Sequence, residues 1–174
     1  MNTQSQTAHP VGELISQYLE AVGRKDESAV DRFFHPDIEY IVNGVTAPDP
    51  ASGLPPISSD LEKAFPWFGI HRGRVAVKAF LNLLHQNLEV TAYGPRTVIS
   101  DGGKAAAFGW FRLRALSTGR TIDVGYAVLA EVKEGLITKY QFVENTCAVA
   151  DAFRIAGVWQ FATGGAIHKI PASH

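Results

Sequence analysis

Residues 17–40 read QYLEAVGRKDESAVDRFFHPDIEY and run from an amphipathic helix through a second, short helix into a strand. The apolar residues at helical spacing in and just before this stretch are Val11, Leu14, Ile15, Tyr18, Leu19 and Val22. They predict a helix over residues 11–23, with Gly23 suited to its C-terminal end. The second helix should end before His35-Pro36, because proline disfavours helical backbone in the residue before it. The stretch therefore predicts a helical hairpin that leads into a strand.

The rest of the chain is mostly β. Ile38, Tyr40 and Val42 alternate with polar residues, which predicts a half-buried strand, and residues 73–86 return to helical spacing. Four segments rich in β-branched and aromatic residues follow, with glycine-containing turns between them: 89–100, 104–116, 120–132 and 136–144. A last helix should start at Asn145 and end by Gly157.

Residues 44–69 break this pattern. The segment contains five prolines and ends in the aromatic residues Phe65, Trp67 and Phe68. A loop this long inside a compact domain usually serves as a lid or a binding element. We therefore predict that its apolar end covers a pocket.

The order of elements predicts one α+β domain, in which a curved, mainly antiparallel sheet wraps around the N-terminal helices as a cone-like barrel. We expect a disordered leader over residues 1–10, the domain over 11–157 with the loop insertion at 44–69, and a C-terminal tail over 158–174. A chain of 174 residues fits one domain of ordinary size.

Composition argues against several classes of function. Sixteen basic and seventeen acidic residues are spread without a basic stripe, so we expect no nucleic-acid or membrane partner. No stretch approaches 18 apolar residues, and the single cysteine, Cys147, cannot form an internal disulfide. We therefore expect a cytoplasmic protein. No histidines and carboxylates show metal-site spacing and no glycine loop could hold phosphates, so we predict no metal and no cofactor.

Four pieces of the chain resemble the nuclear transport factor 2-like superfamily, and within it the SnoaL-like polyketide cyclases and ketosteroid isomerase-like proteins. They are residues 17–40, the G-x-x-A-V-x-x-F pattern that begins at Gly73, the hairpin GRTIDVGYAVLAEV and the closing ITKYQFVENT, and together they cover most of residues 11–155. The resemblance implies an apolar pocket inside the curved sheet, a few polar side chains at its bottom, and a homodimer.

The same resemblance bears on three positions. Tyr18 falls where ketosteroid isomerase carries its oxyanion-binding tyrosine, although the residue could equally be an aromatic core residue. Val42 and Val128 fall where that enzyme carries its two catalytic aspartates. Because valine transfers no proton, the resemblance does not extend to true ketosteroid isomerase activity.

Strand alternation selects the other candidates. If Val128 faces inward, so do Val124 and Tyr126, and the last strand turns Tyr140, Phe142 and Glu144 toward the pocket. Glu144 is then the candidate general base, since burial among aromatic rings would raise its pKa toward neutrality. The alternative is that Glu144 contacts the start of the next helix or an arginine.

Two further assignments remain open in the sequence. His71 could overhang the pocket mouth as a proton carrier, or it could anchor a loop. The strand over 104–116 could turn either face inward. We expect Arg112 and Arg114 to point outward, because a buried charge is costly without a partner. An inward Arg112 could pair with Glu144, and an outward Trp110 could pack at an interface.

These features predict a pocket protein for a small apolar cyclic ligand. The leading hypothesis is a cofactor-independent enzyme that transfers protons in isomerisation, cyclisation or dehydration, with Tyr18, Glu144 and His71 as catalytic residues. The residues expected to line the ligand site are Tyr40, Val42, Trp67, Tyr126, Val128, Tyr140 and Phe142. The alternatives are a non-catalytic ligand-binding protein, and an assembly subunit similar to the small subunit of ring-hydroxylating dioxygenases.

Overall fold

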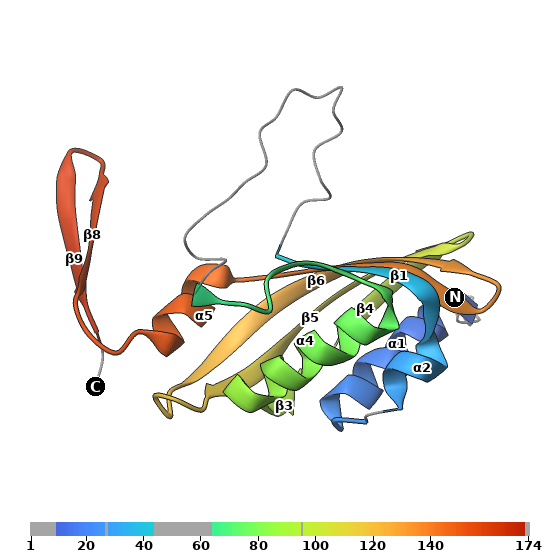
Figure 1. The fold of residues 1–174 in the computed structure, drawn as a ribbon. Helices are drawn as coiled ribbons and strands as arrows, with labels where there is room; N and C mark the ends of the chain where they lie inside the picture. The colour runs from blue at the N-terminus through green and yellow to red at the C-terminus, as the bar shows by residue number, and fades with distance from the viewer. Residues whose placement is uncertain (1–9, 27, 44–63, 95, 173–174) are drawn as a thin grey trace.

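A computed structural model describes residues 10–26, 28–43, 64–94 and 96–172 (Figure 1). The helices in these residues are α1 (Pro10–Gly23), α2 (Ala29–Phe33), α4 (Gly73–Asn87) and α5 (Thr146–Phe153). The strands are β1 (Phe34–Val42), β2 (Gly69–Arg72), β3 (Leu88–Tyr93), β4 (Thr97–Asp101), β5 (Lys104–Ala115), β6 (Thr121–Lys133), β7 (Leu136–Glu144), β8 (Val158–Thr163) and β9 (Ala166–Pro171). The helical hairpin and the strand after it are present as predicted.

Seven strands form one curved sheet in the order β2-β1-β7-β6-β5-β3, with β4 also paired to β5. Only β1 and β7 run parallel; the other described pairs are antiparallel. Helices α1, α2 and α4 cover one face of the sheet (Figure 1). The predicted α+β class is therefore confirmed, with a sheet that curves around the helices and does not close on itself.

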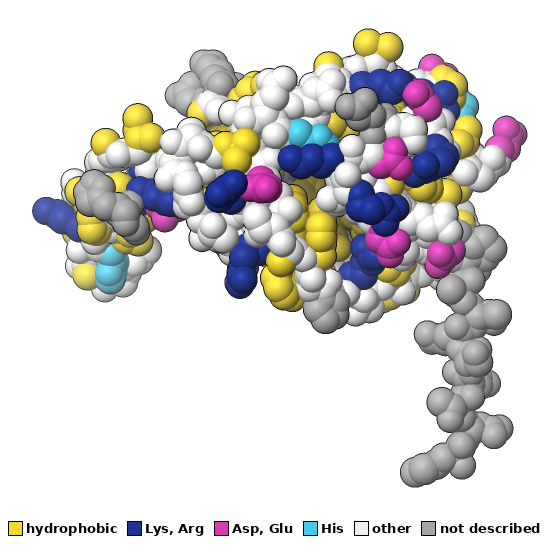
Figure 2. All heavy atoms as spheres, turned by 90° about the horizontal axis from the view of Figure 1, so that it is seen from below, with side chains coloured by type: hydrophobic (Ala, Val, Ile, Leu, Met, Phe, Trp, Pro, Cys, Tyr) yellow, Lys and Arg dark blue, Asp and Glu magenta, His cyan; other side chains and the backbone are white. Residues whose placement is uncertain are grey.

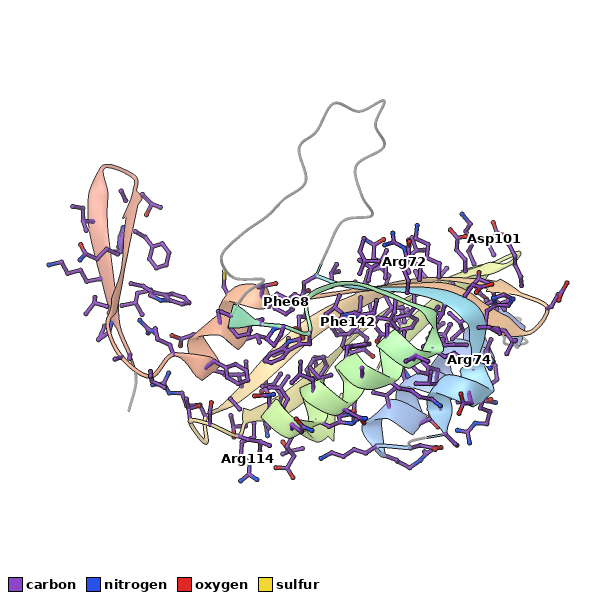
Figure 3. The ribbon with its side chains drawn as sticks, in the orientation of Figure 1. Phe68, Arg72, Arg74, Asp101, Arg114 and Phe142 are labelled. Atoms are coloured by element: carbon purple, nitrogen blue, oxygen red, sulfur yellow. The ribbon has the colours of Figure 1, made fainter. Side chains whose placement is uncertain are left out.

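The two longest strands show why this face is the inner one. On β5 the buried residues alternate with exposed ones, so that Phe111 and Leu113 face the helices while Arg112 and Arg114 face outward. Figure 3 shows Arg114 pointing away from the domain. On the outer face Arg112 pairs with Asp123 of β6 at 2.7 Å, and Arg114 pairs with Glu89 of β3 at 2.6 Å. The outward orientation of the arginines is confirmed, and the alternative of an Arg112–Glu144 pair is wrong.

The predicted strand over residues 89–100 is two strands, β3 and β4. Both pair with β5, and the break between them falls at Gly94, opposite Trp110. The Trp110 indole lies so close to Gly94 that a Cβ there would come within 1.9 Å of the ring. The bulky ring on the outer face thus excludes a side chain at this position, and Trp110 itself remains 38% exposed.

Part of the predicted loop insertion is ordered against the domain. Residues 44–63 lie outside the described residues, so the prediction of a lid over 44–69 can be followed only at its apolar end. There Phe65 and Trp67 are buried, and both rings contact Phe153 of α5. Gly69–Arg72 is not loop but strand β2, which pairs antiparallel with β1.

The C-terminal region contains structure that the sequence did not predict. The side chain of Asn145 accepts a hydrogen bond from the Ala148 N–H at the start of α5, as expected for a cap. After Gly157, strands β8 and β9 form an exposed hairpin where a tail was predicted (Figure 1). Arg154 anchors the base of this hairpin by donating hydrogen bonds to the carbonyl oxygens of Ile170 and Pro171, each at 2.9 Å. The predicted leader lies almost wholly outside the described residues.

Candidate functional site

A cavity of about 110 Å³ lies between the inner face of the sheet and helices α1 and α4. One water needs roughly 10–15 Å³, so the space can hold several waters or one small ring. Figure 2 shows hydrophobic side chains lining a hollow on the face seen from below. The lining residues are Tyr18, Leu19, Val22, Gly23, Lys25, Tyr40, Val42, Trp67, Phe80, Leu81, Leu84, His85, Leu88, Val90, Tyr93, Phe111, Leu113, Tyr126, Tyr140, Phe142 and Glu144.

Three tyrosines from three elements meet at the wall of this cavity. Tyr18 comes from α1, Tyr40 from β1 and Tyr140 from β7, and all three are buried. The ring centroids lie 4.7 Å apart for Tyr40 and Tyr140 and 5.1 Å apart for Tyr18 and Tyr140. The Tyr18 hydroxyl donates a hydrogen bond to the Tyr40 hydroxyl at 3.4 Å. Burial raises the pKa of each phenol, so all three hydroxyls remain protonated donors at neutral pH. Tyr18 is thus both a core residue and part of the cavity wall.

Glu144 reaches the cavity from the last residue of β7, and Asn43 holds it in place. The Asn43 side chain donates to Glu144 Oε1 at 3.1 Å and accepts from the Glu144 N–H at 2.9 Å. Asn43 has a left-handed backbone (φ 49°), a conformation that asparagine tolerates better than most residues. In this conformation the side-chain amide of Asn43 points at Glu144, which lies 101 residues further along the chain.

The surroundings of Glu144 decide its protonation. Within the described part of the chain the carboxylate has no basic partner at ion-pair distance, and the predicted alternative of a contact with an arginine is wrong. Desolvation by burial raises the pKa of Glu144 to about 7, against a smaller lowering by the Asn43 hydrogen bond. At neutral pH the group therefore exists in both protonation states, as a general acid–base requires.

Two further hydrogen-bond donors, the Tyr40 hydroxyl and the Trp67 indole N–H, lie in cavity-lining residues. Tyr40 is close enough for the carboxylate charge to add to the rise of its pKa, after the larger effect of burial. Trp67 is 3% exposed and lines the cavity, and its indole N–H has no hydrogen-bond partner among the described residues. A buried donor without a partner is costly, so this N–H is available to an acceptor on a ligand. Figure 3 shows Phe142 between the sheet and α4 in this region.

The cavity has a second polar end, which the sequence analysis missed. Lys25 after α1, His85 in the last turn of α4 and Tyr93 on β3 all line it. Burial lowers the pKa of His85, and the nearby Lys25 charge lowers it further. Nothing in the local sequence marks these three residues, because they come from three separate elements that meet only in the folded chain.

Residues 15–140 match the SnoaL-like domain family, which is most of the chain. The chain belongs to the SnoaL-like domain family. No curated protein matches this SnoaL-like chain. The predicted resemblance to the nuclear transport factor 2-like superfamily is confirmed.

Solved structures with the same fold share little sequence with this SnoaL-like domain. A nuclear transport factor 2-like protein from Burkholderia xenovorans is 21% identical, with a TM-score of 0.66 over 86% of this chain and 100% of that chain. A candidate polyketide cyclase from Xanthomonas campestris is 18% identical, with a TM-score of 0.62 over 80% and 93%. TerC, co-crystallised with polyporic acid, is 18% identical, with a TM-score of 0.64 over 83% and 98%. At these identities the comparison shows a common fold.

The cavity brings together most of the predicted site residues of the SnoaL-like domain, but not all. Tyr18, Glu144 and the predicted ligand residues Tyr40, Val42, Trp67, Tyr126, Tyr140 and Phe142 line it, whereas Val128 and His71 do not. Val128 is buried in the core on the inner face of β6. His71 stacks on Phe80 at 4.3 Å, and its Nε2 lies 3.0 Å from the Trp67 carbonyl oxygen. In this position His71 contacts the end of the loop at Trp67 and is not among the residues that line the cavity.

The described residues contain neither a cluster of metal ligands nor a membrane-spanning helix. No group of three or more histidine, cysteine, aspartate or glutamate side chains lies close enough together to hold a metal ion. No described helix is long and apolar enough to cross a membrane. The polar groups that line the cavity are carboxyl, phenol, indole, imidazole and ammonium groups.

Proposed function

We propose that this SnoaL-like protein is a cofactor-independent enzyme that transfers a proton on a small cyclic compound, in an isomerisation, cyclisation or dehydration. One observation carries the proposal: burial raises the pKa of the Glu144 carboxyl group to about 7, and Glu144 shares a mostly apolar cavity with phenol hydroxyls. An acid with this pKa both accepts and returns a proton at neutral pH. Strongly perturbed pKa values in a cavity cluster at functional sites.

The catalytic cycle follows from the groups around Glu144. Its carboxylate removes a proton from a carbon next to a substrate carbonyl, the C–H electron pair forms the enolate, and the carboxylic acid later returns the proton to another carbon. The developing negative charge on the oxygen needs donors. The Tyr40 hydroxyl, supported by Tyr18, and the Trp67 indole N–H are the groups able to supply them. In a dry site such hydrogen bonds stabilise charge more than in water.

The size of the cavity limits the substrate. About 110 Å³ suits a compound with one ring, and the lining is mostly aliphatic and aromatic. Apolar pockets with a few polar groups are typical of small-molecule sites. The crystal of TerC with polyporic acid supports a small-molecule ligand for a protein of this fold.

A second candidate function is ligand binding without turnover. It is favoured by Val42 and Val128, which occupy the positions where the resemblance predicted the catalytic aspartates. The third hypothesis, an assembly subunit, would be supported by copurification with a larger iron–sulfur protein.

Hydrogen–deuterium exchange separates these hypotheses without knowledge of the product. Cyclic ketones are incubated in D₂O, and the exchange of the protons next to the carbonyl is followed by NMR. We expect exchange with the wild-type protein, its loss in Glu144→Gln, and unchanged ligand binding in that variant. Exposed Glu134→Gln, in the β6–β7 turn, is the matched control and should exchange at the wild-type rate. Binding of the ketones without exchange would favour the non-catalytic function.

A further inference from the structure

The second polar end of the cavity lies on the opposite side from Glu144. Glu144 is on β7, Tyr93 is on β3, and β6 and β5 lie between them in the sheet. Strands are spaced 4.7–4.9 Å apart, so β7 and β3 are separated by about 14 Å across the sheet. Side chains from both sides extend into this gap, which leaves space for a single ring with one substituent. A ligand in the cavity therefore has two distinct polar surroundings.

Lys25 brings a positive charge to this end. Its backbone is left-handed (φ 55°), and its N–H donates to the Val22 carbonyl at 2.9 Å, which fixes the turn after α1. The acids nearby are already paired: Asp26 with Arg32, and Glu20 with an arginine of the β3–β4 connection. In the described part of the chain Lys25 itself has no acidic partner.

His85 and Tyr93 add two neutral donors. Burial and the charge of Lys25 lower the pKa of His85, so its imidazole is neutral at pH 7 and donates one N–H. Burial raises the pKa of Tyr93 to about 12, which keeps its hydroxyl protonated. The Tyr93 ring packs against Gly23, where a Cβ would come within 2.7 Å of it. Glu144 is the only acidic residue among the cavity-lining residues that the structure describes, and it belongs to the other end.

We propose that the ligand is a small cyclic carboxylate whose anionic group binds between Lys25 and His85 while its ring extends toward Glu144. An ammonium group and two neutral donors, with no competing acid, match the oxygens of a carboxylate. In Figure 2 basic, acidic and histidine side chains lie around the edge of the apolar hollow. The inference deepens the proposed function for the reaction at the ring, but the binding of the anion does not depend on catalysis.

The test compares 3-oxocyclohexanecarboxylate with its neutral carboxamide. Binding is measured by calorimetry in the Glu144→Gln variant, so that turnover and the charge of Glu144 play no part. We expect the carboxylate to bind about five-fold more tightly, in the range of a partly exposed ion pair. Adding Lys25→Met should abolish the preference and leave the carboxamide affinity unchanged. Adding Lys133→Met, at an exposed position outside the cavity lining, should preserve it.

NMR titration of His85 gives an independent measurement. The carboxylate should raise the pKa of His85, because a nearby anion favours the charged imidazolium, and the carboxamide should leave it unchanged. Equal affinity of the two probes, no binding of either, or a preference that survives Lys25→Met would overturn the inference. A preference for the carboxylate together with an absence of proton exchange in the wild-type protein would support this site and contradict the proposed reaction.

Discussion

Replacing Glu144 by glutamine should make the folded protein more stable at high pH. Burial raises the pKa of Glu144 from its ordinary value of 4.5 to about 7. At about 1.36 kcal/mol per pKa unit the difference amounts to roughly 3 kcal/mol. Glu144 as a whole residue is partly exposed, so solvent screening reduces this cost, and we take about 1–3 kcal/mol.

The direction in which stability changes with pH follows from the protonation equilibria of Glu144 in the folded and the unfolded chain. In the folded chain the Glu144 carboxyl keeps its proton up to about pH 7, whereas in the unfolded chain it loses the proton near pH 4.5. The wild-type free energy of unfolding should therefore fall between pH 4.5 and 7 and stay lower above that range. Glutamine has no such titration, and its amide oxygen can still accept from Asn43.

Urea denaturation at several pH values between 4.5 and 8 provides the measurement. The difference in the free energy of unfolding between Glu144→Gln and wild type should grow by about 1–3 kcal/mol in favour of the variant across this range. Glu134→Gln, which changes the same chemical group at an exposed turn, should show no comparable increase. A flat difference for Glu144→Gln would mean that the carboxyl is not desolvated, and the argument for a general base would fail with it.

Three other changes test the site and its walls. Asn43→Gly removes the hydrogen bond that lowers the pKa of Glu144, so NMR titration of that carboxyl should give a midpoint above about 7; an unchanged midpoint would contradict the assigned contact. Tyr40→Phe should reduce the rate of proton exchange about 10²-fold with little effect on ligand affinity, as for removal of one oxyanion donor. Equal losses of exchange rate and ligand affinity would indicate that Tyr40 has a structural role. Gly109→Ala should cost about 1–3 kcal/mol of stability because its Cβ would lie 2.8 Å from a tyrosine hydroxyl, whereas Gly125→Ala has open space and serves as the control in thermal denaturation.

The contrast between Glu144 and His71 shows what sequence reasoning could and could not place. Glu144 lies on a regular strand, so the alternation of side chains, with Val128 taken as inward from the family resemblance, turned it toward the cavity with Tyr140 and Phe142. His71 lies on β2, in the short stretch between the predicted loop insertion at 44–69 and the next helix, for which the sequence predicted no strand. Without the strand pairing there was no way to decide which side of β1 it would occupy. The sequence did not identify Lys25 and His85 as cavity residues for a similar reason. They lie on separate elements, which come together with the other cavity residues only in the folded chain.

The sequence by itself determined the α+β class, the helical hairpin and the alternation of side chains along each strand, because these depend on periods of 3.6 and 2 residues within one element. Which face of residues 104–116 turns inward stayed open. Only the tertiary structure decided which polar groups share a cavity. The parallel pairing of β1 with β7 brings Asn43 to Glu144, and the outward Trp110 indole divides the next edge into β3 and β4. Such contacts depend on the register between distant segments, and the packing of the whole chain selects that register.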